Sequence, residues 1–156
     1  MGSDATRLLL IAAAFVSGLL AGGNIDRALV AMPAWQQVGA VSWAEFSRHA
    51  DLGNGLWLYP IEAFGGAFLT LGTAANYYFG RIARPGFAIP LCAAIVFSGC
   101  GLLLTIKAAP IMLGINNVND PAALQTAFGG FRFWGNIRGG SQVLAFAALM
   151  WALRMF

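Results

Sequence analysis

The stretch GFAIPLCAAIVFSGCGLLLTI, residues 86–106, contains twenty-one residues and no charged side chain. As an α-helix it would measure about 31 Å, close to the roughly 30 Å hydrocarbon core of a bilayer. An uncharged segment of this length is typical of a transmembrane helix. We therefore expect lipid to surround this part of the chain.

The rest of the chain is also apolar. Of 156 residues, 59% are hydrophobic and 10% are charged, whereas about 25% are charged in ordinary globular domains. The net charge of +3 comes without a run of basic residues, so no nucleic-acid partner is expected. Cys92 and Cys100 fit neither a CxxC pair nor a metal site, and we interpret both as helix-packing residues.

Three more apolar segments lie on either side of residues 86–106. We predict an all-α integral membrane protein, an up-down four-helix bundle forming a single transmembrane domain over residues 1–156. Its spans are expected at about 7–32, 55–80, 86–112 and 133–155. The first span also resembles the apolar part of a signal peptide. Because Ala21-Gly22-Gly23 is only a weak cleavage signal, we interpret it as a helix.

The connection between the first two spans, residues 33–54, has the pattern of an amphipathic helix. Pro33 suits the first position of a helix. Such a helix would lie at the membrane interface and cover one end of the bundle. Glu45 and His49 would then be neighbours, with His49 facing inward. The apolar face would consist of Trp35, Val38, Trp43 and Phe46.

Short basic loops predict the orientation in the membrane. Arg81 and Arg84 lie in a tight connection between the second and third spans, which favours the cytoplasmic side. With four spans, Arg7 and Arg154 fall on that side too, so both termini are expected in the cytoplasm, at the inner membrane if the source is a bacterium. Most of the charged side chains and tryptophans lie at the opposite face, where we expect a polar site.

Ionisable residues inside a membrane span are candidates for function, because burying their charge in lipid is costly. Glu62 and Arg138 each lie about one turn into their spans, on faces that point into the bundle. We predict His49 or Glu62 as a general base and Arg138 as the group that stabilises an anion. The alternative is a structural ion pair between Glu62 and Arg138. Residues expected to bind substrate are Asn24, Asp26, Arg27, Trp35, Asp51, Trp57, Tyr59, Trp134 and Asn136.

No metal or cofactor is predicted. His49-Ala-Asp51 has the start of a two-histidine metal triad, but the chain contains no second histidine. Two alternatives remain open: a metal or haem held by His49, and a cation bound among Asp26, His49, Asp51 and Glu62.

Three short motifs resemble the small four-span membrane family typified by the fungal anthrone oxygenases. They are Pro33-Ala-Trp35 after the first span, Gly55-Leu-Trp-Leu-Tyr-Pro60 at the start of the second, and Trp134-Gly-Asn136-Ile-Arg138 in the fourth. The resemblance implies oxidation of a tricyclic phenolic anthrone to a quinone by O₂, without a dedicated cofactor. The resemblance does not assign a catalytic or binding role to any residue of this chain.

The expected function is therefore that of a membrane-embedded oxidoreductase, a monooxygenase-like enzyme acting on a lipophilic aromatic or polyketide-type small molecule. The alternative is a non-enzymatic membrane protein: a transporter of small molecules or ions, or an accessory subunit of a larger complex. Gly18-x-x-x-Gly22 and Gly135-x-x-x-Gly139 could join helices within one chain or in a homo-oligomer.

Overall fold

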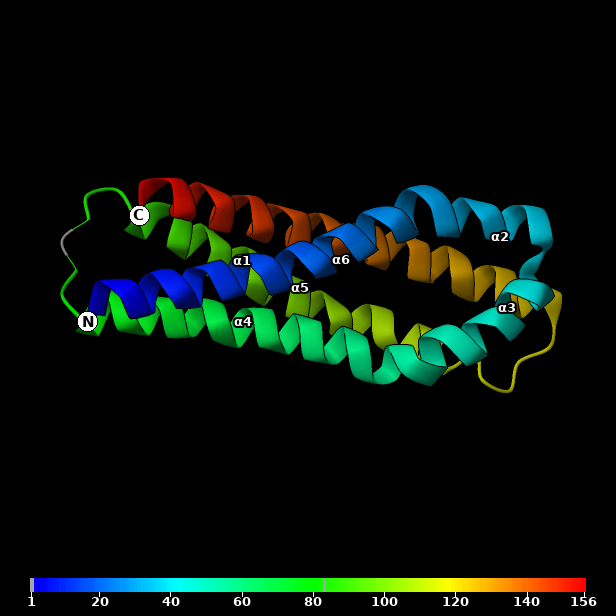
Figure 1. The fold of residues 1–156 in the computed structure, drawn as a ribbon. Helices are drawn as coiled ribbons and strands as arrows, with labels where there is room; N and C mark the ends of the chain where they lie inside the picture. Colours follow the sequence, from blue (N-terminus) through cyan, green and yellow to red (C-terminus); the bar gives the residue numbers. More distant parts are fainter. Residues whose placement is uncertain (1, 83) are drawn as a thin grey trace.

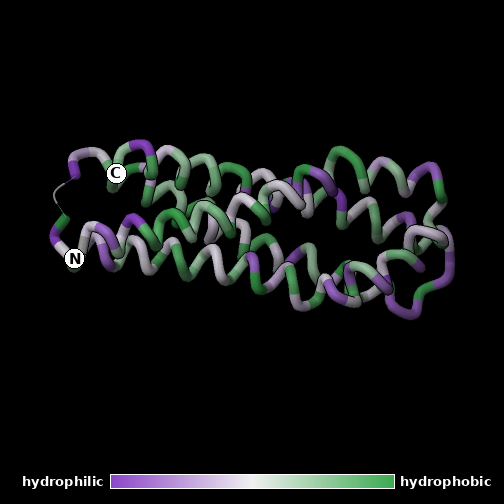
Figure 2. Tube along the Cα trace, viewed as in Figure 1, coloured by the Kyte–Doolittle hydropathy of each residue, from purple (hydrophilic) through white to green (hydrophobic). Residues whose placement is uncertain are grey.

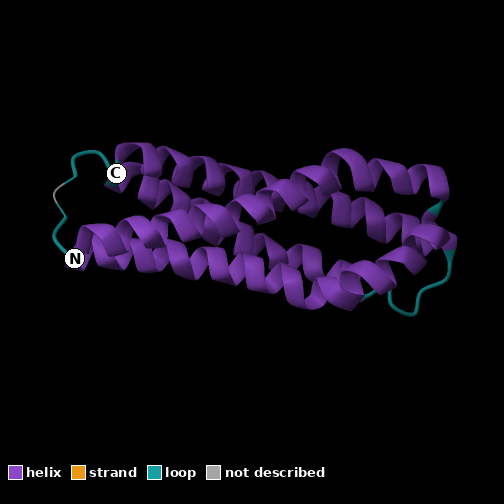
Figure 3. Ribbon diagram, viewed as in Figure 1, coloured by secondary structure: helices purple, strands orange, loops and turns teal. Residues whose placement is uncertain are grey.

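The computed structural model describes residues 2–82 and 84–156. All regular structure in this part of the chain is helical, and Figure 3 shows loops only at the ends of a long bundle. The four long helices are α1 (Gly2–Asp26), α4 (Gly55–Phe79), α5 (Ala88–Leu113) and α6 (Pro121–Met155). Helix α1 packs on α4 and α6, and α5 packs mainly on α6. Both termini lie at one end (Figure 1).

The first helix continues beyond the expected end of its span. After α1 the backbone widens into a π-type turn, η1 (Arg27–Ala31), and runs on as α2 (Met32–Val38). Gly39 then ends this continuous helical segment, with φ +88° and ψ 154°, a conformation that only glycine adopts readily. The predicted interfacial segment is thus two helices rather than one, because Gly39 separates α2 from α3 (Ala40–His49).

A second π-type turn, η2 (Ala50–Asn54), leads from α3 into α4. Gly55, the first residue of α4, is buried, and a Cβ atom there would lie 2.7 Å from the Tyr59 ring and 3.0 Å from the carbonyl oxygen of Ala50 in η2. The start of α4 thus packs tightly against this turn. The observed bounds of α4 and α5 lie within two residues of the predicted spans 55–80 and 86–112.

Helix α6 begins twelve residues before the expected span 133–155. The Asp120 side chain accepts a hydrogen bond from the backbone N–H of Ala123 (2.9 Å), and Pro121 occupies the first turn. Both are strong helix-start signals. The additional turns carry Leu124 and Phe128, which are fully buried. They pack at the end of the bundle formed by α2, α3 and the start of α6, at the right of Figure 1.

The buried apolar side chains form two separate clusters. One, the end core, lies at the α2–α3 end and includes Trp35, Trp43, Met112 and Phe128. The other lies near the termini and includes Leu10, Phe87, Ala94 and Leu149. Between the two clusters the buried side chains are partly polar, with Ser17 and Gln142 each only 7% exposed. The middle of the bundle is therefore where a site can form.

Two of the described helical segments are long and apolar enough to cross a membrane: residues Ser3–Val38, which include α1 and α2, and α5. Hydrophobic residues occur along the whole length of the bundle, as Figure 2 shows. The Gly18 position packs inside the chain, because a Cβ atom there would lie 3.0 Å from the Phe146 ring, whereas Gly22 has open space around it.

Candidate functional site

A cavity of about 610 Å³ lies between the two apolar clusters. Its walls come from α1, η1, α3, η2, α4, α5 and α6. Seven of the twelve predicted site residues line it: Asn24, Asp26, Arg27, Asp51, Tyr59, Glu62 and Arg138. The lining from α5 is mainly apolar and consists of Leu102, Thr105, Ile106, Ala109, Pro110 and Leu113. A single site with one polar and one apolar side results.

The Arg27 and Asp51 side chains form a two-pronged ion pair in the wall of the cavity. Arg27 Nη1 donates to Asp51 Oδ1 (2.6 Å) and Nη2 donates to Oδ2 (2.7 Å), with the side chains 18% and 11% exposed. The parallel bonds fix the orientation of both groups. This pair joins η1 to η2, so the two π-type turns are held together near the α2–α3 end of the bundle. We call this end the mouth of the bundle.

Arg138 lies on the same aromatic ring as Arg27 but has no carboxylate partner. The two guanidinium carbons lie 4.8 Å (Arg27) and 6.0 Å (Arg138) from the centroid of Phe131. Arg138 Nε is buried and has no hydrogen-bond partner, and no described carboxylate oxygen lies within 4.0 Å of its nitrogens. A partly buried guanidinium without such a partner favours an anion beside it.

Glu62 lines the same cavity and is also unpaired. Among the described residues its carboxylate makes no ion pair and no hydrogen bond. The alternative of a structural ion pair between Glu62 and Arg138 is therefore wrong. One helix presents a carboxylate and another a guanidinium to a shared space, and neither charge is neutralised by the other. This arrangement allows both groups to act on a third molecule.

A pair of amides closes the polar side of the cavity. Asn24 Nδ2 donates to Gln142 Oε1 (2.6 Å) and to the backbone carbonyl of Leu20 (2.7 Å). A Cβ atom at Gly139 would lie 3.2 Å from Asn24 Cβ, so this glycine allows α1 and α6 to approach closely here. Gln142 was not among the predicted site residues, although it shares a helix face with Arg138, four residues earlier.

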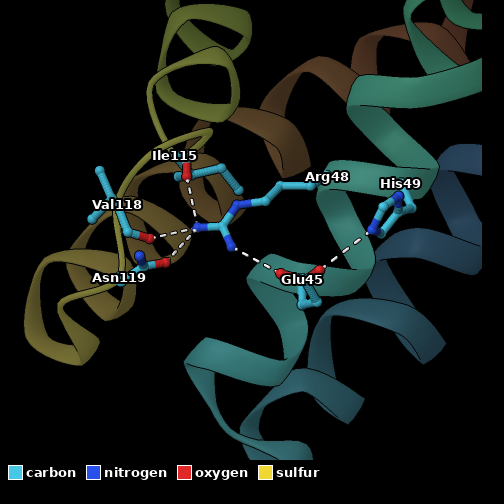
Figure 4. Close-up of polar contacts among 6 residues, drawn as sticks. All are labelled: Glu45, Arg48, His49, Ile115, Val118 and Asn119. Carbon is cyan, nitrogen blue, oxygen red and sulfur yellow. Dashed lines mark hydrogen bonds and ion pairs between the residues drawn. The ribbon is translucent and has the colours of Figure 1, made fainter.

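His49 points away from the cavity, so the expectation that it faces inward is wrong. Its side chain is 82% exposed, with Nε2 3.3 Å from Glu45 Oε1 (Figure 4). The cause is Arg48, which donates to the carbonyls of Ile115 (3.2 Å) and Val118 (2.6 Å) and to Asn119 Oδ1 (3.2 Å). These three acceptors lie in the loop between α5 and α6. Successive helical residues are about 100° apart, so holding Arg48 against this loop turns His49 outward.

Glu45 links Arg48 and His49 on the outer surface of α3. Its Oε2 accepts a hydrogen bond from Arg48 Nη1 (3.0 Å), while Oε1 faces His49. The hydrogen bond from Arg48, followed by that from His49, lowers the pKa of the Glu45 carboxyl below its usual value. Asp51, two residues after His49, pairs with Arg27.

The expected tryptophan lining does not assemble around the cavity. Trp35 is buried against Phe128, with ring centroids 5.4 Å apart, and Trp57 is 77% exposed on the outside of α4. Trp134 packs at the edge of the end core, and Asn136 lines a separate small pocket. The aromatic residues that do line the cavity are Trp43, Phe46, Tyr59 and Phe64. The early start of α6 supplies Phe128, which draws Trp35 away.

The residues expected for a cation do not come together. Within residues 2–82 and 84–156, no three His, Cys, Asp or Glu side chains form a group able to hold a metal ion. Asp26, Asp51 and Glu62 line the cavity without forming such a group, and His49 lies outside it. Cys92 and Cys100 are both unpaired and exposed on α5.

Comparison with protein-family models, with curated proteins and with solved structures finds no match. The resemblance to the anthrone-oxygenase family thus stays a prediction from three motifs. Three of their residues, Tyr59, Pro60 and Arg138, line the cavity, whereas Trp35 and Trp57 do not.

Proposed function

We propose that α1, α4, α5 and α6 cross a lipid bilayer and that α3 lies at its surface. Large apolar side chains on three of these helices are exposed by about two thirds: Phe15 (66%), Phe68 (68%) and Leu103 (66%). In the 18-residue window that qualifies each of the two most apolar segments, only 28% and 22% of the residues are buried within the protein. Such a surface is unfavourable in water and favourable in lipid.

The charges at the ends favour one orientation. Arg81 and Arg84 lie in the loop at the end that carries the termini, and the Arg84 guanidinium stacks on Phe156 at 5.2 Å. This basic end belongs in the cytoplasm by the usual distribution of Lys and Arg. The mouth of the bundle, with the Arg27–Asp51 pair, then faces the opposite side.

The cavity is proposed to bind a lipophilic aromatic molecule that carries an acidic C–H or O–H group. Its volume of about 610 Å³ falls within the roughly 300–1,000 Å³ of small-molecule sites. The wall from α5 would contact the flat apolar body, while Glu62 and Arg138 would face the acidic group. These two charges, unpaired in one cavity, are the observation on which the proposal rests.

Acid–base chemistry follows from this pair. Glu62 would remove a proton from an activated CH₂ carbon, and Arg138 would stabilise the negative charge on the conjugated oxygen. Dissolved O₂, the second substrate, would form a C–O bond with the carbanion and give a peroxide. Loss of the second C–H proton and cleavage of the O–O bond would yield a ketone and water. The carbon loses four electrons and O₂ gains four, so no further oxidant is needed.

The test uses the protein in liposomes with a phenolic anthrone as the probe. The Glu62→Gln variant should lower the protein-dependent rate of quinone formation and O₂ uptake by about 100-fold or more, the usual contribution of a general base. Arg138→Gln should lower it to a similar extent, because it removes the stabilising charge. His49→Gln is the matched control and should retain the full rate.

Two results would contradict the proposal. Turnover that survives Glu62→Gln would exclude this carboxylate as the base. Saturable binding of the anthrone without turnover would assign the cavity to a carrier of lipophilic molecules instead.

A further inference from the structure

A second, much smaller space lies directly beneath the cavity, toward the termini. It is lined by Ser17 of α1, Glu62 and Gly66 of α4, Ser98 of α5 and Gln142 of α6. Glu62 and Gln142 line both spaces, so they form part of the boundary between them. Each of the four long helices contributes one polar side chain to this interior space.

Two of these polar groups lack the partner that hydroxyls in this protein usually have. Thr70, Thr73, Thr105 and Ser141 each donate a hydrogen bond to the carbonyl four residues earlier in their helix. Ser17 and Ser98 make no such bond and none with another described residue. Ser17 is 93% buried, at 7% exposure. A hydroxyl removed from bulk water without a new partner is unfavourable, so a bound water would satisfy it.

The size of the space matches one water molecule. The volume open to water is about 20 Å³, and about 10–15 Å³ suffices for one water when two to four polar groups surround it. Two glycines leave room for the polar side chains that line it. A Cβ atom at Gly66 would lie 3.0 Å from Ser17 Oγ, and one at Gly101 would lie 3.0 Å from Gln142 Cγ.

We propose that this space binds one water molecule, held by Ser17, Ser98, Gln142 and the Glu62 carboxylate. Gln142 Oε1 already accepts a hydrogen bond from Asn24, so its Nε2 is left to donate to the water. The two serine hydroxyls can donate or accept, and the water donates to Glu62. The water supplies the hydrogen bonds that the helices do not, and it fixes the carboxylate at the inner end of the cavity.

A structure determined in lipid at a resolution that shows ordered waters tests the site directly. We expect one density peak within hydrogen-bonding distance of Glu62 and of at least two of the other three side chains. An empty space with well-ordered side chains around it would overturn the proposal. The water site does not depend on the proposed activity, so it can fail or stand independently of the anthrone assay.

Infrared spectroscopy of variants tests whether the bound water donates a hydrogen bond to the Glu62 carboxylate. The Glu62 carboxyl band is identified by its loss in Glu62→Gln. It should shift in Ser17→Ala/Ser98→Ala, together with loss of the band of a bound water that responds to H₂¹⁸O. Ser141→Ala, which removes a hydroxyl satisfied by Ile137, is the control and should change neither band. Unchanged bands in the double variant would contradict the proposal.

A sodium ion is the competing occupant, since one carboxylate and neutral oxygens also suit a hard monovalent cation. Thermal unfolding in NaCl and in choline chloride separates the two. We expect equal midpoints, because water binding does not depend on the cation. A rise in the unfolding midpoint that is specific to sodium and disappears in Glu62→Gln would contradict the proposal. It would show that a cation, and not water, occupies the space.

Discussion

Arg27 directly follows Asp26 in the sequence, yet its guanidinium pairs with Asp51, twenty-four residues away. Asp26 is exposed at the rim, whereas Asp51 is largely buried. Helical geometry accounts for this choice, because neighbours in a helix point about 100° apart and cannot pair face to face. The residue that neutralises Arg27 is therefore set by where η2 folds back on η1.

Asp51→Asn should destabilise the protein by about 2 kcal/mol, less than for a fully buried pair because both side chains keep some exposure. The reason is that Arg27 would remain largely buried without its counter-charge. The free energy of unfolding in mixed micelles measures the loss. The Arg27→Gln/Asp51→Asn double variant should lose less than the sum of the single variants. Additive losses would show that the two residues do not interact.

At the scale of elements, Gly39 determines how the α2–α3 end is built. Its backbone conformation, φ +88° and ψ 154°, costs other residues about 1–3 kcal/mol. Gly39→Ala should therefore lower the free energy of unfolding by about that amount and loosen the packing of Trp43, seen as a change in tryptophan fluorescence. Gly72→Ala is the control, because its Cβ atom would meet open space in a regular helix. Equal effects of the two substitutions would contradict this role.

The elements predicted best from sequence are those whose signal is local. Helix α5 has one charged residue, Lys107, in 26, so hydrophobicity alone predicts its bounds to within two residues. Helix α6 was placed too late because the prediction followed hydrophobicity and passed over Asp120 and Pro121, a start signal that the sequence contains.

The site was harder to predict because it depends on contacts between distant segments. Helical phase placed Glu62 and Arg138 correctly toward the interior. It could not show that Arg48 would bind the carbonyls of Ile115 and Val118 and thereby turn His49 outward. Nor could it show that Phe128 would pack against Trp35. Both outcomes depend on how loops and helix ends meet in three dimensions.

At the scale of the whole molecule, the proposed topology predicts which ends of the helices are accessible from each side. Cys92→Ala/Cys100→Ala provides a background without cysteine, in which Ser3→Cys and Asn117→Cys mark opposite ends of the bundle. A membrane-impermeant maleimide should label Asn117→Cys in intact cells, and Ser3→Cys only after permeabilisation. Labelling of both from the same side would contradict a bundle that crosses the bilayer.

The length of α6 has a consequence for how ligands reach the protein. Its 35 residues measure about 52 Å, whereas the hydrocarbon core is about 30 Å thick. In the proposed topology about 20 Å of bundle then stands above the lipid, and the cavity lies near the headgroup layer. A lipophilic molecule would enter the cavity from the bilayer, in which it is dissolved, and not from the aqueous phase. Its occupancy therefore follows its mole fraction in the membrane rather than its concentration in water.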